Sequence, residues 1–167
     1  LSIVQKGIFE DVPQHGRFLF LDLHHEVKEQ DVRVMGRTAG GVRGIALKST
    51  DKVVSASITK KSDSTNTLLV VGEKGFGKKT SLKEYKVQKR GGSGIKTAKV
   101  TTKTGKLVGG AVLAPDDKAE GELVVMSKKG QVIKLPLKDV PSLGRDTQGV
   151  RIMKLRAGDA IASIVTF

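Results

Sequence analysis

The chain has 167 residues, of which 38% are hydrophobic, and it carries a formal net charge of +13. It contains no cysteine, which excludes disulfides, thiolate metal sites and cysteine nucleophiles. No apolar run approaches the roughly 20 residues of a membrane span, and no signal peptide opens the chain, so we expect a soluble, cytoplasmic protein without a membrane partner. Because residue 1 is Leu, we also expect a fragment of a longer polypeptide.

The positive charge is concentrated in the middle of the chain. Lys and Arg outnumber Asp and Glu by 2 in residues 1–60 (9 against 7), by 9 in residues 61–115 (12 against 3) and by 2 in residues 116–167 (9 against 7). A basic cluster of this kind is typical of a protein that binds nucleic acid. The alternative is a soluble protein that is merely basic.

A motif recurs three times along the chain. An acid and an apolar residue are followed by Arg-x-x-x-Gly, then by Val or Ile, then by Arg or Lys. Repeats of 53 and 55 residues indicate a propeller, a solenoid or an array. The copies are Asp31, Val32, Arg37, Gly41, Val42 and Arg43; Glu84, Tyr85, Arg90, Gly94, Ile95 and Lys96; and Asp139, Val140, Arg145, Gly149, Val150 and Arg151.

The first repeat is the least regular. Residues 18–21 are predicted as the opening strand of a blade, whereas residues 1–17 match no pattern and are interpreted as a remnant of an earlier blade, a linker or altered sequence. We therefore divide the chain into an N-terminal segment (1–25), an incomplete first blade (26–62), a second blade (63–117) and a third blade (118–167).

Each of the later repeats is predicted to form two hairpins, with about four short strands in all. In the second repeat, residues 68–71 turn through 73–75 and continue to 82, and residues 95–100 pair with 107–113. In the third, residues 123–126 pair with 132–135, and 150–155 pair with 160–165. No stretch has a sustained period of 3.6 residues, so we expect an almost entirely β fold.

The strand after each motif glycine has apolar residues at offsets one, four and six. Offsets one and four have opposite parity, so a plain strand cannot bury both, and we predict a bulge between them. The bulge would turn the cation at offset two outward. Arg43, Lys96 and Arg151 are therefore candidate contacts of three successive blades, with solvated surface charges as the alternative.

The segment 88–94, Gln-Lys-Arg-Gly-Gly-Ser-Gly, is the sharpest local motif. Its glycines permit close approach of backbone N–H groups to phosphate oxygens, while Lys89 and Arg90 supply charge and Gln88 an amide. We interpret it as a grip on a phosphate backbone. The alternative is a flexible turn between strands.

Other motifs do not support an enzyme. Residues 72–78 have the glycine spacing of a nucleotide-binding loop, but Lys79 replaces the required Ser or Thr and the flanks predict strand-turn-strand. Tyr85 occupies the slot of Val32 and Val140, which predicts a packing role. The histidines at 15, 24 and 25 lack metal-ligand spacing, and the acids at 116, 117, 120 and 122 form a solvated connection without the pattern of a calcium loop.

Segment 88–94 resembles the box of the DNA gyrase A C-terminal domain, whose family form is Gln-Arg-Arg-Gly-Gly-Lys-Gly. Segment 36–45, segment 75–80 with Glu84 and Tyr85, and segment 144–150 look like the matching parts of consecutive blades. The resemblance therefore covers residues 26–167 nearly without gaps. The family's defining box belongs to its first blade, whereas this copy lies in the second of three repeats. The chain is similar to the last three of about six blades.

The resemblance implies an all-β fold, a β-pinwheel of four-stranded blades, whose basic rim binds, bends and wraps duplex DNA without sequence preference and supports ATP-dependent negative supercoiling. It implies a non-catalytic domain of a bacterial type II topoisomerase, near the nucleoid, with the rest of gyrase A and gyrase B as partners. Metal and cofactor sites are not expected here, since ATP and Mg²⁺ belong to other parts of the enzyme. The expected DNA-binding residues are Arg37, Arg43, Lys78, Lys79, Lys83, Lys86, Gln88, Lys89, Arg90, Gly91, Gly92, Gly94, Lys96, Lys99, Arg145 and Arg151.

Two alternatives remain at this stage. One is the equivalent domain of topoisomerase IV, and the other is a protein-binding propeller, against which the Lys-rich candidate surface argues. Because three blades leave terminal sheets without neighbours, we also expect the fragment to self-associate.

Overall fold

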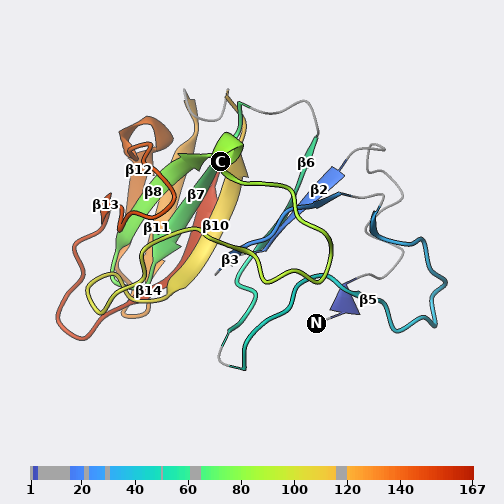
Figure 1. The fold of residues 1–167 in the computed structure, drawn as a ribbon. Coiled ribbons are helices and arrows are strands. Elements are labelled where there is room, and N and C mark those ends of the chain that lie inside the picture. The colour runs from blue at the N-terminus through green and yellow to red at the C-terminus, as the bar shows by residue number, and fades with distance from the viewer. Residues whose placement is uncertain are drawn as a thin grey trace.

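The computed structural model describes residues 2–3, 16–20, 23–28, 31–49, 51–60, 65–115 and 120–167 (Figure 1). Short β-strands dominate the described part, which confirms the all-β prediction. In chain order the elements are β1 (Ser2–Ile3), β2 (Gly16–Phe20), β3 (Leu23–His24), β4 (Val27–Lys28), β5 (Val42–Arg43), β6 (Ala56–Lys60), β7 (Thr67–Gly72), β8 (Phe76–Ser81), the 3₁₀ helix η3 (Leu82–Glu84), β9 (Ile95–Lys96), β10 (Leu107–Leu113), β11 (Glu122–Ser127), β12 (Val132–Pro136), the 3₁₀ helix η4 (Leu137–Asp139), β13 (Val150–Arg151) and β14 (Ile161–Thr166).

The first hairpin predicted in each of the later repeats is confirmed. β7 pairs with β8 from Thr67↔Ser81 to Val71↔Gly77, and β11 pairs with β12 from Glu122↔Pro136 to Met126↔Val132. The opening strand predicted near residue 18 is also present as β2, while Leu21 lies outside the described residues. A short apolar run bounded by a glycine turn is therefore a sufficient signal for these pairs.

The second hairpin predicted in each repeat is wrong. β10 pairs with β7 and β14 pairs with β11, so three strands of one repeat form a sheet. β13 instead crosses to β8 of the preceding repeat, and β9 crosses to β3. The seven residues of β10 bury more apolar surface along the hairpin than they would against the two residues of β9, which favours the exchange.

The exchanged strand completes the sheet of the preceding repeat. The central sheet has the order β10-β7-β8-β13, in which Val150 lies opposite Gly77 and Arg151 opposite Phe76 (Figure 1). In the first repeat β5 pairs with β1 in the same antiparallel manner. Residues 2–3, to which the sequence assigns no pattern, thus occupy the place of a preceding repeat. The third sheet, β12-β11-β14, has no fourth strand among the described residues.

The central strand β7 is buried on both faces, which holds the repeats together. Leu69 and Val71 belong to the apolar cluster shared with the third repeat, whereas Leu68 and Val70 belong to a second cluster with Tyr85. At about 25 cal/mol for each Å² of apolar surface, this two-sided burial makes the contact between sheets a main source of stability. The predicted packing role of Tyr85 is confirmed.

The predicted bulge is confirmed in the third repeat. Just beyond β13, the consecutive N–H groups of Ile152 and Met153 both donate to the carbonyl oxygen of Gly75, at 2.9 and 3.2 Å. Two donors that share one acceptor are the signature of an extra residue in a strand. The side chain of Met153 is thereby buried, as are those of Ile45 and Ala98 at the same offset.

Candidate nucleic-acid interface

The motif glycines direct the three repeated cations to the surface. Gly41, Gly94 and Gly149 all have left-handed φ values, between 77° and 79°, a conformation that favours glycine. The next residue pairs with the preceding repeat, and the residue after it is exposed in each case. These exposed cations are Arg43, Lys96 and Arg151, so the predicted outward orientation is confirmed, while their contact with DNA stays a prediction.

Aromatic stacking orients one of these cations. The guanidinium carbon of Arg151 lies 5.5 Å from the ring centre of Phe76, and the ammonium nitrogen of Lys103 lies at the same distance. A cation above an aromatic face is attracted by the ring quadrupole. Phe76 therefore holds two positive charges at the start of β8.

The box-like segment 88–94 is a latch to the first repeat. Gly91 donates its N–H to the carbonyl of Gly44 at 2.7 Å, and the carbonyl of Gly92 accepts from Ala46 at 2.9 Å. The N–H of Gly92 is directed to the carbonyl of Lys89. The prediction that Gly91 and Gly92 present N–H groups to phosphate is therefore wrong, because those donors are already used within the fold.

Gln88 anchors the same latch. Its backbone N–H donates to the carbonyl of Glu26, and its side-chain oxygen lies 2.6 Å from Nδ1 of the buried His25. The side-chain oxygen of Gln88 is already paired with His25, so the prediction that this oxygen contacts DNA is wrong. Lys89 and Arg90 remain exposed between the anchoring residues of the latch, Gln88 and Gly91, where they add charge to the surface.

The structure contradicts the DNA-contact role predicted for Lys78 and Lys79. Only 1% of Lys78 and 5% of Lys79 is exposed. The ammonium group of Lys78 donates to the carbonyls of Gly144 and Arg145 and to the hydroxyl of Thr147, and that of Lys79 donates to the carbonyl of Leu137. A buried charge needs such partners, and here most of them are backbone carbonyls of the third repeat.

These bonds fasten residues 141–149, which we call the strap, across the second repeat. Lys79 exchanges backbone hydrogen bonds with Pro141 and Leu143, at 2.9 and 2.8 Å, and Lys99 donates its N–H to Thr147 at 3.0 Å. Arg145, expected as a DNA contact, is half-buried: its N–H donates to Glu84 and its guanidinium to the carbonyl of Lys96 at 3.4 Å. The strap is therefore a fixed part of the candidate surface.

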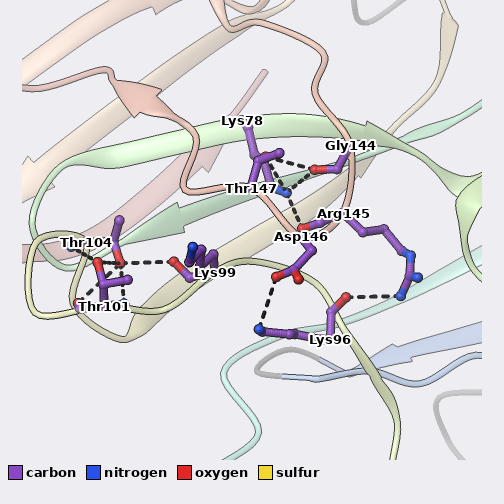
Figure 2. Close-up of polar contacts among 9 residues, drawn as sticks. All are labelled: Lys78, Lys96, Lys99, Thr101, Thr104, Gly144, Arg145, Asp146 and Thr147. Atoms are coloured by element: carbon purple, nitrogen blue, oxygen red, sulfur yellow. Dashed lines mark hydrogen bonds and ion pairs between the residues drawn. The ribbon is translucent and has the colours of Figure 1, made fainter.

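The acid Asp146 lies among the cations Lys78, Lys96, Lys99 and Arg145 (Figure 2). Oδ1 of Asp146 lies 3.0 Å from Nζ of Lys96, and both side chains are largely open to solvent. The hydrogen bond and charge of Lys96, with Lys99 and Lys78 nearby, lower the pKa of Asp146. Sequence reasoning missed this contact, although an acid directly after the motif arginine is a visible signal.

Nine of the predicted contact residues remain as exposed cations: Arg151 and the eight residues named below. Most of these cations lie in the second repeat, where the sequence has its largest excess of positive charge. One of them, Lys96, is paired with Asp146. The eight are Arg37, Arg43, Lys83, Lys86, Lys89, Arg90, Lys96 and Lys99.

The buried Lys78 predicts an unusual pH dependence of stability. Burial lowers its pKa to about 8 from an ordinary value of 10.5. Between these values the unfolded chain holds the proton and the folded chain does not, so the free energy of unfolding should rise with pH, by at most about 1.4 kcal/mol per unit. Urea denaturation at about pH 7.5 and about pH 9.5 measures the rise, which Lys78→Met should abolish. Parallel behaviour of the two proteins would refute this role.

The other motifs have structural roles. The segment with nucleotide-loop spacing is the turn between β7 and β8, as predicted. His24 is buried 4.0 Å from the ring of Tyr85, and burial lowers its pKa. Glu122 pairs with Lys134 at 2.5 Å, while Asp116 and Asp117 lie outside the described residues.

In the part of the chain that is described, no three His, Asp or Glu side chains are grouped to hold a metal, and no helix has the length and apolarity of a membrane span.

Comparison with protein families gives a match over all three repeats. The matching family is "DNA gyrase C-terminal domain, beta-propeller", at residues 27–60, 66–114 and 121–167. The chain is 44% identical over 137 residues to the DNA gyrase A protein of Lawsonia intracellularis, and 41% identical over 133 residues to that of Kosmotoga olearia. These alignments cover 82% and 80% of the chain but only 16% of each relative.

Solved structures agree with the family match. A DNA gyrase A C-terminal domain superposes with a TM-score of 0.80 at 25% identity, covering 93% of this chain and 52% of that one. The C-terminal domain of a DNA topoisomerase IV also superposes with a TM-score of 0.80, at 20% identity and with 92% and 46% coverage. The second likeness is one of fold, and both agree with the predicted β-pinwheel.

Proposed function

The chain belongs to the DNA gyrase C-terminal domain family, and from that premise we propose that it binds duplex DNA without sequence preference, and bends and wraps it along its exposed cations. The observation that carries the proposal is the equivalent exposed position of Arg43, Lys96 and Arg151 in three successive repeats. Exposed cations that recur in successive repeats suit a phosphate backbone, which carries one negative charge per nucleotide. Lys89 and Arg90 add charge where the sequence is most basic.

The proposal places the chain in a larger assembly. As it spans about a sixth of the relatives, the remainder of gyrase A and gyrase B are its proposed partners, and ATP and Mg²⁺ would act elsewhere in that enzyme. This domain would have no catalytic site of its own and would support negative supercoiling in the cytoplasm, at the nucleoid, by holding a DNA segment in a wrapped path. Among the described residues β12 has no strand on its outer edge, and this edge is the proposed site of self-association, since an unpaired strand edge seeks a partner.

The gyrase family is favoured over topoisomerase IV because the superposed gyrase domain is 25% identical to this chain and the topoisomerase IV domain 20%, and because the relatives named above are gyrase proteins. A protein-binding propeller is disfavoured by the charge of the surface. Lys is depleted at the centres of protein interfaces, whereas five of the remaining exposed candidate cations are lysines, at positions 83, 86, 89, 96 and 99.

Salt dependence tests the proposed function. Binding to two duplexes of equal length and unrelated sequence should be equally tight, because the candidate contacts are Lys and Arg side chains that suit phosphates, and phosphate contacts carry no sequence information. If roughly six phosphates are neutralised, the logarithm of the binding constant should fall with the logarithm of salt concentration at a slope near −5. Fluorescence anisotropy with labelled duplexes measures both quantities. A flat salt dependence, or a strong preference for one duplex, would contradict the proposal.

A further inference from the structure

We propose that Asp146 is a built-in competitor of DNA: its carboxylate occupies the ammonium group of Lys96 and so limits how tightly the second repeat holds a phosphate backbone. The inference rests on the proposed DNA binding and adds a residue that restrains it. Asp146 lies on the strap of the third repeat, whereas Lys96 lies on β9 of the second (Figure 2).

The contact is built by the fold and does not depend on two exposed side chains alone. Arg145, the neighbour of Asp146, donates from its guanidinium to the carbonyl of Lys96. Lys78 holds the carbonyls of Gly144 and Arg145 from beneath the strap. The backbone that carries Asp146 is thus fixed close to Lys96, and the carboxylate has a short reach to the ammonium group at 3.0 Å.

The ion pair has little to contribute to folding. The Lys96 side chain is 56% exposed and that of Asp146 is 67% exposed, and ion pairs in such high dielectric add little stability. The nearby cations that lower the pKa of Asp146 keep it ionised at neutral pH. Its charge therefore acts mainly on ligands that approach the surface.

The acid is specific to one repeat. In the position after the motif arginine, the first and second repeats carry Thr38 and Gly91, and the third carries Asp146. A phosphate that approaches Lys96 must displace a carboxylate and is repelled by it. Lys96 consequently adds nothing to counterion release until the pair opens.

The test compares Asp146→Asn with Asp139→Asn. Asp139 is an exposed acid of η4 in the same repeat, so the two substitutions change the net charge equally at different places. We expect Asp146→Asn to bind a labelled duplex roughly three- to tenfold more tightly at low salt. Its salt slope should be steeper by about 0.9, the contribution of one further phosphate contact. Asp139→Asn should change affinity less than about twofold.

A second pair of variants asks whether Asp146 acts through Lys96. In a Lys96→Ala background, Asp146→Asn should lose most of its effect on both affinity and salt slope. Equal effects of Asp146→Asn and Asp139→Asn, or an unchanged effect in the Lys96→Ala background, would overturn the inference while leaving DNA binding intact. If the unmodified chain does not bind duplex DNA, the proposed function fails and the inference falls with it.

Discussion

Alanine in place of Gly149 is expected to lower the free energy of unfolding by about 2–4 kcal/mol. The glycine has a φ of +77°, a conformation that strains other residues, and an added Cβ would lie 2.6 Å from the carbonyl oxygen of Gly77. That oxygen belongs to the backbone of β8, on which β13 is paired. The substitution should therefore force the exchanged strand away from the central sheet.

Two other glycines separate the causes of this loss. Gly130 has a φ of +82° with nothing within 4 Å of an added Cβ, so Gly130→Ala should cost only the conformational strain, about 1 kcal/mol. Gly36 has open space and no left-handed φ, so Gly36→Ala should be nearly neutral. Urea denaturation of the three variants gives the comparison. If Gly149→Ala and Gly130→Ala lose the same stability, the close approach to β8 is not the reason for the glycine.

The local hairpins can be predicted because their signals are local. The pair β7–β8 follows from an apolar run, a glycine turn and a second run of matching length. The bulge after β13 likewise follows from the change of parity between Val150 and Met153. In both cases a short stretch of chain contains the whole argument.

The exchange of strands between repeats cannot be predicted in the same way. A strand such as β10 has the same pattern whether it pairs with β9 or with β7, so the sequence does not select the partner. The choice depends on how much surface each pairing buries, which is a property of the assembled sheets. The repeat itself is visible in the sequence, but the sharing of one sheet by two repeats is not.

The candidate site shows the same limit. Lys78 and Lys79 are predicted as DNA contacts from the resemblance of their segment to a family, but the structure buries both side chains. Lysine is almost never fully buried unless it is paired. Their partners are carbonyls of the third repeat, 58 to 67 residues away in sequence, and only the fold brings them together. The N–H groups of Gly91 and Gly92 are misassigned for the same reason, since the sequence does not identify their acceptors.

Replacing Lys89 and Arg90 together with alanine is expected to weaken DNA binding roughly 10- to 100-fold at low salt, and to make the salt slope shallower by about 1.8. Both side chains are exposed between the anchoring residues of the latch, in residues 61–115, which carry the excess of +9. Subtracting the two buried lysines from that excess leaves +7, which still exceeds the +2 of either flanking stretch. Charge, rather than a backbone grip, is the reason for the prediction.

The matched control is the double replacement of Arg37 and Arg43 with alanine. It also removes two positive charges, but from the exposed surface of the first repeat. Because fewer cations surround that pair, its loss should weaken binding less, roughly three- to tenfold. Neither variant should change the urea midpoint appreciably, since none of the four side chains is buried. Equal losses of affinity would mean that segment 88–94 joins two repeats and contributes to binding no more than any other pair of surface cations. A larger loss from the Lys89 and Arg90 variant would place the strongest part of the DNA path on the second repeat, beside the Lys96 and Asp146 pair that restrains it, whereas a larger loss from the Arg37 and Arg43 variant would contradict the prediction.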